Sequence, residues 1–325
     1  MEKTLTFAQL SDPHLSSLDG VRWRELANKR LLGYLSWRRR RRAEHRGEVL
    51  EALRRDLRQT RPEHLVITGD LTHIALPDEF RQARHWLESL GSPRAVTVVP
   101  GNHDAYVPVP WAQGLSLWEP YLIADEVRGG VRADTAEAVF PALRVRGPVA
   151  FIGLSSARPS PPLLATGRLG GSQLQRLEAL LEQTGRQGLF RVVLLHHPPV
   201  PGEEKWRKRL TDAAQLCAVI ARQGAELVLH GHRHRAVQSR IEIPGTHVPV
   251  FGIPSASSIG YRTGHAAQYH IYRVRQSGVV WRLELEVRGY SAEKSMFVAE
   301  TASRVEIARR LPPCGGCSRP SPPAP

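Results

Sequence analysis

Side chains that can bind metal ions occur in short clusters along this chain. Five such clusters appear in order, and each follows a short apolar run. They are Asp12-Pro13-His14, Gly69-Asp70, Gly101-Asn102-His103-Asp104, His196-His197 and Gly231-His232-Arg233-His234. Any one of them alone is more often a turn than a functional site. Together they offer imidazole, carboxylate and amide groups without thiolate, the ligand set of catalytic divalent Mn, Fe or Zn rather than of a structural zinc site.

Asp70 is the residue that could join two metal ions. Paired cations about 3.5–4 Å apart share an oxygen ligand, which an aspartate can supply. Glycines precede Asp70, Asn102 and His232. Because glycine lets the backbone turn sharply, each could direct the next side chain into a common site. We therefore expect a centre that holds two divalent metal ions.

Short strands alternating with helices are expected to position these clusters. Six apolar runs rich in Val, Ile and Leu predict buried strands, at residues 4–10, 64–68, 95–99, 149–154, 191–195 and 226–230. Amphipathic helices are predicted at 48–59, 173–181 and 211–223, and antiparallel strands within 247–288. This alternation indicates the α/β class. Because open α/β sheets bind ligands beyond the carboxyl ends of their strands, clusters far apart in sequence can converge there.

Composition indicates a soluble globular protein. Of the 325 residues, 41% are hydrophobic, and no apolar run has the length of a membrane-spanning helix. Three cysteines (Cys217, Cys314 and Cys317) exclude a disulfide-stapled fold and suit a reducing compartment, and no secretory signal is visible at the N-terminus. We expect a cytoplasmic protein with one domain over residues 1–311 and a disordered Pro/Gly-rich tail over 312–325, in which the cysteine pair is inert.

Positive charge is concentrated in one short segment. The chain has 45 Lys and Arg against 31 Asp and Glu, a net charge of +14. Ten of these Lys and Arg residues lie within 21–46, where only Glu25 and Glu44 oppose them. An excess of this kind predicts an anionic partner: a phosphorylated substrate, an anionic lipid or a nucleic acid.

The five clusters, intact and in order over about residues 5–235, resemble those of the calcineurin-like metallophosphoesterase superfamily. The resemblance implies a four-layer αββα sandwich with two mixed β-sheets. It also implies two divalent ions per chain, Mn²⁺ by preference, with Fe and Zn as alternatives. The implied ligands of one ion are Asp12, His14, Asp70 and His234, and those of the other are Asp70, Asn102, His196 and His232. His196 is preferred to His197 because the family's ligand occupies the first position of that motif.

The same resemblance assigns the catalytic groups. His103 follows the ligand Asn102 and is expected to protonate the leaving oxygen or to stabilise the transition state. Asp104 or another carboxylate is expected to orient His103. His197 is expected to pack or to hydrogen-bond behind the site.

Residues 21–46 form a basic insertion between the first and second clusters. At helical spacing one broad face would carry the apolar residues Trp23, Leu26, Ala27, Leu31, Tyr34 and Trp37. Beside that face lie five arginines, Arg38 to Arg42, a pattern typical of a helix on an anionic membrane surface. We therefore predict membrane contact through 23–42, at the cytoplasmic face. The alternatives are an arm packed on the domain with its arginines in water and, less favoured, a nucleic-acid-binding surface.

Two segments of the sequence indicate different substrates. The stretch Lys-Arg-Leu-Leu-Gly-Tyr-Leu-Ser-Trp-Arg-Arg, residues 29–39, resembles the branch that hydrolyses the pyrophosphate of UDP-2,3-diacylglucosamine in lipid A biosynthesis, which is the expected activity. The alternative is a cyclic-nucleotide phosphodiesterase of the 3′,5′-cAMP type, because residues 167–178 resemble those enzymes. A third interpretation, an interaction protein with a vestigial metal site, is disfavoured by the complete ligand set.

Overall fold

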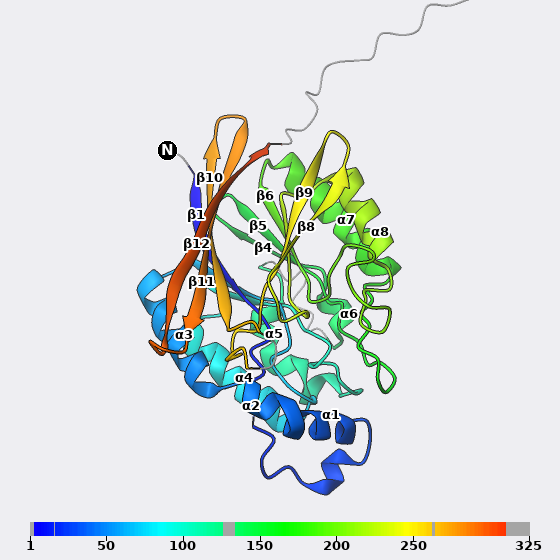
Figure 1. The fold of residues 1–325 in the computed structure, drawn as a ribbon. Coiled ribbons are helices and arrows are strands. Elements are labelled where there is room, and N and C mark those ends of the chain that lie inside the picture. The colour runs from blue at the N-terminus through cyan, green and yellow to red at the C-terminus, as the bar shows by residue number, and fades with distance from the viewer. Residues whose placement is uncertain (1–2, 16, 126–133, 262–263, 310–325) are drawn as a thin grey trace, which may run out of the picture.

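The computed structural model describes residues 3–15, 17–125, 134–261 and 264–309. Two six-stranded sheets of mixed direction form its centre (Figure 1). The first runs in the order β12 (Met296–Ala308), β11 (Val280–Ser291), β10 (Gln268–Ser277), β1 (Thr4–Leu10), β2 (His64–Ile67), β3 (Val96–Val98). The second runs β4 (Ala142–Arg146), β5 (Val149–Gly153), β6 (Phe190–Leu194), β7 (Leu227–His230), β9 (Thr246–Gly252), β8 (Val237–Ile243). The predicted disordered tail, with Cys314 and Cys317, lies outside the described residues.

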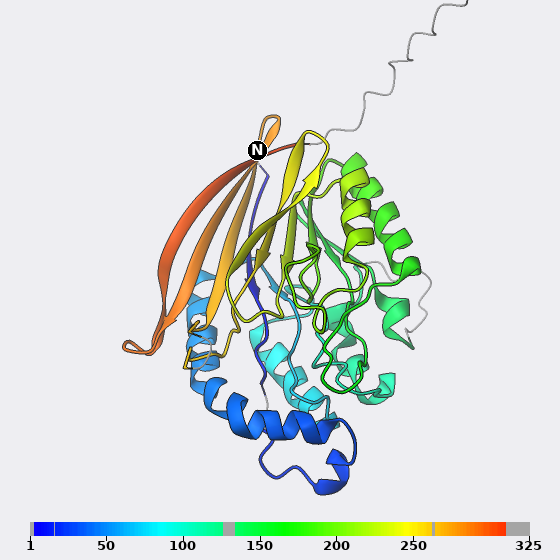
Figure 2. The same ribbon diagram turned by 45° about the vertical axis from the view of Figure 1, so that its right-hand side comes forward.

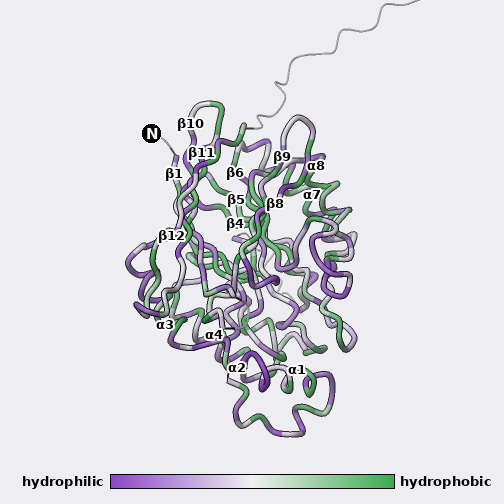
Figure 3. Tube along the Cα trace, viewed as in Figure 1, coloured by the Kyte–Doolittle hydropathy of each residue, from purple (hydrophilic) through white to green (hydrophobic). Residues whose placement is uncertain are grey.

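The six predicted strands are confirmed as β1, β2, β3, β5, β6 and β7, and β1–β2–β3 and β5–β6–β7 are parallel. Apolar side chains of the two sheets meet between them, with the rings of Phe7 and Phe151 centred 5.0 Å apart. Figure 3 shows hydrophobic residues along the central strands and a mixed pattern on the surrounding helices. Within 247–288 the antiparallel expectation holds for β10 with β11 and for β9 with β8, while β9 is also parallel to β7 on its other side.

Helices form the outer layers of the sandwich. The predicted helices are confirmed as α3 (Gly47–Thr60), α7 (Gly171–Arg186) and α8 (Ala213–Gln223). A fourth long helix, α4 (Pro77–Leu90), was not predicted. The apolar faces of α3 and α4 join the core of the first sheet, and those of α7 and α8 pack on the second sheet (Figure 2). Two short helices, α5 (Glu119–Leu122) and α6 (Ala136–Val139), lie in the connections.

The basic insertion folds at one end of the molecule, where Figures 1 and 2 show it in blue. It consists of the 3₁₀ turn η1 (Trp23–Leu26), then α1 (Arg30–Ser36), the π-helical turn η2 (Trp37–Arg41) and α2 (Arg42–Glu44). Two further 3₁₀ turns, η3 (Trp111–Gln113) and η4 (Leu115–Trp118), follow β3. Within the described ranges, none of the helices has the length and apolar character that crossing a bilayer requires.

The single apolar face predicted for the insertion is not formed. Leu26 and Trp37, each 3% exposed, are buried with Ile74 and Leu76 in a small core, whereas Trp23 is 75% exposed. The physical reason is that the loop after β2 offers Trp37 apolar partners on the domain itself. Most of the insertion's arginines remain exposed, so the segment matches the alternative of an arm packed on the domain.

Candidate metal centre

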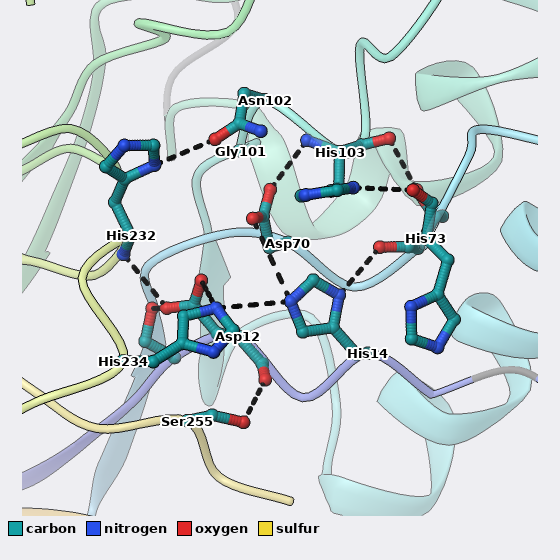
Figure 4. Close-up of polar contacts among 12 residues, drawn as sticks. Asp12, His14, Asp70, His73, Gly101, Asn102, His103, His232, His234 and Ser255 are labelled. Carbon is teal, nitrogen blue, oxygen red and sulfur yellow. Dashed lines mark hydrogen bonds and ion pairs between the residues drawn. The ribbon is translucent and has the colours of Figure 1, made fainter. Parts of the chain in front are cut away.

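Residues of the five clusters meet at the carboxyl-terminal ends of parallel strands from both sheets. Figure 4 shows the clusters that contain Asp12, Asp70, Asn102 and His232. In the first sheet, Leu10 of β1 pairs with Ile67 of β2, so the two chains leave the sheet side by side. The backbone N–H of Asp12 then donates to the carbonyl of Gly69 at 2.9 Å. In the second sheet, β6 and β7 are parallel in the same way. The chain reaches His196 just after β6, and His232 and His234 just after β7. Convergence of distant clusters is therefore a direct result of sheet topology.

The first group of side chains surrounds one point. The ligand atoms of Asp12, His14, Asp70 and His234 all lie within 4.8 Å of one another. Nε2 of His234 lies 3.1 Å from Oδ1 of Asp12 and 3.4 Å from Nε2 of His14. Nε2 of His14 lies 4.0 Å from Oδ2 of Asp70. Two carboxylates and two imidazoles are thus directed at a shared centre.

The second group adjoins the first through Asp70. Nε2 of His196 lies 3.3 Å from Oδ2 of Asp70 and 3.1 Å from Oδ1 of Asn102. The same Asn102 oxygen lies 2.8 Å from Nδ1 of His232. Oδ2 of Asp70 therefore faces both groups, the position that a shared ligand of two cations would occupy.

The donor set fits two divalent cations. Nδ1 of His14 lies 3.0 Å from the carbonyl of Thr72, and Nδ1 of His196 lies 2.7 Å from the carbonyl of Thr68. Donation to a carbonyl fixes each ring and leaves Nε2 directed at the site, as is usual for histidine ligands of metals. Oδ1 of Asp12 is buried, and its polar neighbour is Nε2 of His234 at 3.1 Å, itself a proposed ligand atom. A cation would satisfy these atoms.

Electrostatics of the site favour bound positive charge. Burial alone would raise the pKa of Asp12, but neighbouring histidines, His234 above all, bring it down to about 2. Burial alone would lower the pKa of His196, yet the Asp70 carboxylate raises it to about 9. Burial lowers the pKa of His14 and of His232 well below the usual value, so their rings are neutral and able to act as ligands.

Backbone conformation at the site is strained. Five of the cluster residues have left-handed backbone angles, an uncommon state for residues other than glycine. They are Asp12 (φ 51°), His14 (43°), Asp70 (58°), His232 (73°) and His234 (51°). Gly69 has a φ of 96°, and a Cβ on Gly101 would overlap the Asp70 carboxylate. Gly69 therefore makes the sharp turn expected of it, whereas Gly101 is needed for the close approach of the Asp70 carboxylate, which the sequence did not predict.

Residues 5–236 match the family described as calcineurin-like phosphoesterase. The chain belongs to this family. A probable cyclic nucleotide phosphodiesterase of Synechococcus sp. is 31% identical over 189 residues, which span 57% of this chain and 63% of that protein, less than two thirds of its length. A 3′,5′-cyclic-nucleotide phosphodiesterase of Nostoc sp. is 26% identical over 236 residues, covering 71% of this chain and 72% of that protein.

Among solved structures, a dimetal phosphatase from Danio rerio has a TM-score of 0.58 and 14% identity, over 93% of this chain and 100% of that chain. At this identity the likeness supports the fold alone. The two mixed sheets between helices are thus the metallophosphoesterase architecture expected from the sequence.

The surroundings of His103 in this metallophosphoesterase correct one expectation. Nδ1 of His103 lies 2.5 Å from the carbonyl oxygen of His73, so a backbone carbonyl, not a carboxylate, orients the ring. Asp104 instead accepts hydrogen bonds from backbone N–H groups, including those of Asp70 and Gly101. The physical reason is that the loops after β2 and after β3 direct these backbone N–H groups at the Asp104 carboxylate, so its oxygens are already hydrogen-bonded. Burial and the neighbouring Asp70 charge raise the pKa of Asp104 to about 7.

His196 and His197 occupy different surroundings. His196 contacts Asp70 and Asn102, as described above. His197 lies behind the site, with Nδ1 2.7 Å from the Ser156 hydroxyl and Nε2 3.2 Å from the carbonyl of Ala165. Both nitrogens of the His197 ring are therefore engaged away from the ligand groups.

Three further residues near the centre were not identified from the sequence. His45, at the end of the insertion, has a ligand nitrogen close to those of His14 and His234. The His73 ring stacks on that of His14, with centroids 4.9 Å apart, and Arg41 lies beside His103. The signal for Arg41 and His45 in the sequence is the four-residue spacing of Trp37, Arg41 and His45, which predicts that the three share one helix face. The surrounding arginines indicated a solvent-exposed segment instead.

Proposed function

We propose that this protein is a two-metal phosphodiesterase. The observation that carries the proposal is the position of Asp70, whose Oδ2 lies 3.3 Å from Nε2 of His196 and 4.0 Å from Nε2 of His14. One cation would be held by Asp12, His14, Asp70 and His234, and the other by Asp70, Asn102, His196 and His232. Imidazole with carboxylate and amide oxygen supports manganese, with iron or zinc as alternatives.

When bound, the two cations would activate water for attack on phosphorus and neutralise charge on the phosphoryl oxygens. The chain's own contribution centres on His103. Because Nδ1 of His103 carries its proton to the His73 carbonyl, Nε2 is the nitrogen left to act on the leaving oxygen. Burial lowers the pKa of His103, so Nε2 would first take up the proton released by the attacking water and then pass it to the leaving oxygen. The backbone N–H of His103 donates to Oδ1 of Asp70 at 2.7 Å, which keeps the second oxygen, Oδ2, turned towards both ligand groups.

The substrate we propose is a cyclic nucleotide. Its support is that the relatives from Synechococcus and Nostoc are named as cyclic-nucleotide phosphodiesterases, which favours this substrate over the lipid expected from the insertion. The segment 167–178 does not help to choose the substrate, because its side chains make structural contacts within the domain. Gln173, for example, accepts from the backbone N–H of Ser155 at 2.8 Å at the start of α7.

A diacylated nucleotide-sugar is the second candidate, and one observation favours it. Trp23, Leu31 and Leu32 are 75%, 38% and 44% exposed on the insertion that also carries the exposed arginines Arg38, Arg39 and Arg40. Apolar side chains beside positive charge suit an anionic lipid surface. The burial of Trp37 removes one of the aromatics on which that reading depended.

A direct comparison of substrates tests the proposal. The manganese-loaded protein would be assayed with 3′,5′-cyclic AMP, UDP-2,3-diacylglucosamine and bis(p-nitrophenyl) phosphate side by side. We expect hydrolysis of the aryl diester and of cyclic AMP. Turnover of the lipid alone would transfer the assignment to the second candidate, and hydrolysis of none would refute the phosphodiesterase.

A further inference from the structure

One face of the insertion's helical segment is turned towards the metal centre. Trp37, Arg41 and His45 follow each other at intervals of four residues, and the N–H of His45 donates to the carbonyl of Arg41 at 2.9 Å. Residues at this spacing share a helix face. Trp37 is buried near the ring of His73, and the ring of His45 lies 4.6 Å from that of His14. Arg41 lies between these two inward-facing residues.

The turn that carries Arg41 is π-helical, η2 between α1 and α2. Single π-turns within helices are frequent at functional sites because the extra residue changes which side chains face inward. Arg38, Arg39 and Arg40 are exposed, whereas Arg41 is only partly exposed. Its position is therefore distinct from the solvated part of the arginine run.

Within the described part of the chain, the polar neighbour of the Arg41 guanidinium at the site is the ring of His103. Nη1 lies 3.1 Å from Nδ1 of His103. Because that nitrogen already faces the His73 carbonyl at 2.5 Å and carries the proton there, two donors meet and no ordinary hydrogen bond forms. Among the described residues Arg41 makes no ion pair, although the next residue, Arg42, pairs with Asp19 at 3.3 Å.

Negatively charged groups of the metal centre lie near Arg41. Burial lowers the pKa of Arg41, while the negative charges of Asp70 and Asp12 oppose that shift. Both aspartates belong to the ligand groups described above. The guanidinium therefore lies near the metal centre, with Nη1 beside His103, and no carboxylate of the described residues forms an ion pair with it.

We propose that Arg41 binds a phosphoryl oxygen of the substrate beside His103. A planar guanidinium with free N–H donors suits a phosphate oxygen, and the partly buried position strengthens such a contact. The insertion, which packs on the domain as an arm, then also supplies a substrate-binding residue. This inference rests on the proposed function, because it requires that the centre accept a phosphate ester.

Phosphate binding tests the proposal without turnover. Binding of inorganic phosphate to the manganese-loaded protein would be measured by calorimetry for wild type, Arg41→Gln, Arg41→Lys and the matched control Arg40→Gln, which removes a neighbouring exposed charge. We expect Arg41→Gln to weaken binding about 10- to 100-fold, the effect of losing a charged hydrogen bond. Arg41→Lys should recover part of the loss, and Arg40→Gln should bind as wild type does. Metal content and Tm should stay unchanged in all variants.

The results distinguish a failure of the Arg41 proposal from a failure of the proposed function. Wild-type phosphate affinity in Arg41→Gln would overturn the proposal. If Arg41→Gln folds poorly, Arg41→Lys decides: weaker phosphate binding at normal Tm supports direct contact, and unchanged binding contradicts it. Failure of the wild type to hydrolyse any phosphodiester would refute the proposed function, while phosphate affinity would still decide the role of Arg41.

Discussion

Oδ2 of Asp104 accepts a hydrogen bond from the backbone N–H of Asp70 at 2.9 Å. The same oxygen accepts from the N–H of Gly101 at 2.8 Å, and Oδ1 accepts from the N–H of Thr72 at 2.9 Å. One buried carboxylate thus joins the loop after β2, which carries Asp70, to the loop after β3, which carries Asn102. Its function is to hold proposed ligands from two strands in register.

Replacing Asp104 tests that function. In Asp104→Asn an NH₂ group takes the place of one oxygen and confronts N–H donors, so at least one buried donor loses its acceptor. We expect the unfolding free energy to fall by about 1–3 kcal/mol and the bound metal to decrease. Denaturant unfolding and metal analysis would measure both, with the exposed Asp78→Asn as control. Unchanged metal content would show that the loops keep their positions without this carboxylate.

Asp70 is predicted to be essential to both cations. Asp70→Asn keeps the shape of the side chain but removes the charge that faces both ligand groups, so most of the bound metal and nearly all activity should be lost. Elemental analysis of purified protein would measure the metal per chain. Two ions per chain with normal turnover would contradict the assignment of Asp70 as a shared ligand.

His103 is predicted to act in chemistry rather than in metal binding. His103→Ala should keep its metal content but lose about 10²- to 10⁴-fold in kcat, the range for a general acid. The loss should be smaller for aryl than for alkyl leaving groups, because aryl oxides need little protonation. Measuring kcat with a matched pair of such diesters would test this. An equal loss for both would favour charge stabilisation instead.

The convergence of the five polar clusters could be predicted because each depends on local features, an apolar strand followed by polar side chains, while their role as metal ligands stays a prediction. Asp104 shows where such reasoning ends. The hydrogen-bond partners of Asp104 are backbone N–H groups, and residue types do not indicate such partners. Because Asp104 follows His103 in the sequence, it was instead predicted to orient the His103 ring. The insertion shows a second limit. Whether Trp37 faces a membrane or the domain depends on Ile74 and Leu76, which contact it only in the fold.

Buried neutral histidines should make stability depend on pH. Burial lowers the pKa of His64 to about 3, and Nε2 of His64 lies 2.8 Å from the Thr97 hydroxyl. Since this value lies below the unfolded value of about 6.5, the unfolded chain binds more protons between the two, and the unfolding free energy falls as pH decreases through that window. At pH 5 this difference in proton binding lowers the unfolding free energy by about 2 kcal/mol relative to its value above pH 7. His64→Gln should flatten the dependence between about pH 6.5 and 3 relative to the exposed control His85→Gln; equal slopes would contradict the prediction.

The final prediction concerns the exposed part of the insertion. Arg38, Arg39 and Arg40 are exposed together with Trp23, and each arginine near an anionic surface contributes on the order of 1 kcal/mol. Changing all three to Gln should therefore weaken binding to phosphatidylserine vesicles by about 100-fold, and high salt should reproduce the loss through screening.

Hydrolysis of a small soluble diester should be unaffected in this triple variant, because none of the three is placed in the site. The control carries the same charge change elsewhere, with Arg55, Arg58 and Arg61 around the end of α3 replaced by Gln. Vesicle co-sedimentation at two salt concentrations would measure both proteins. If both triple variants lose affinity equally, net charge alone explains the binding, the insertion has no special role at a membrane, and the lipid substrate loses its remaining structural support.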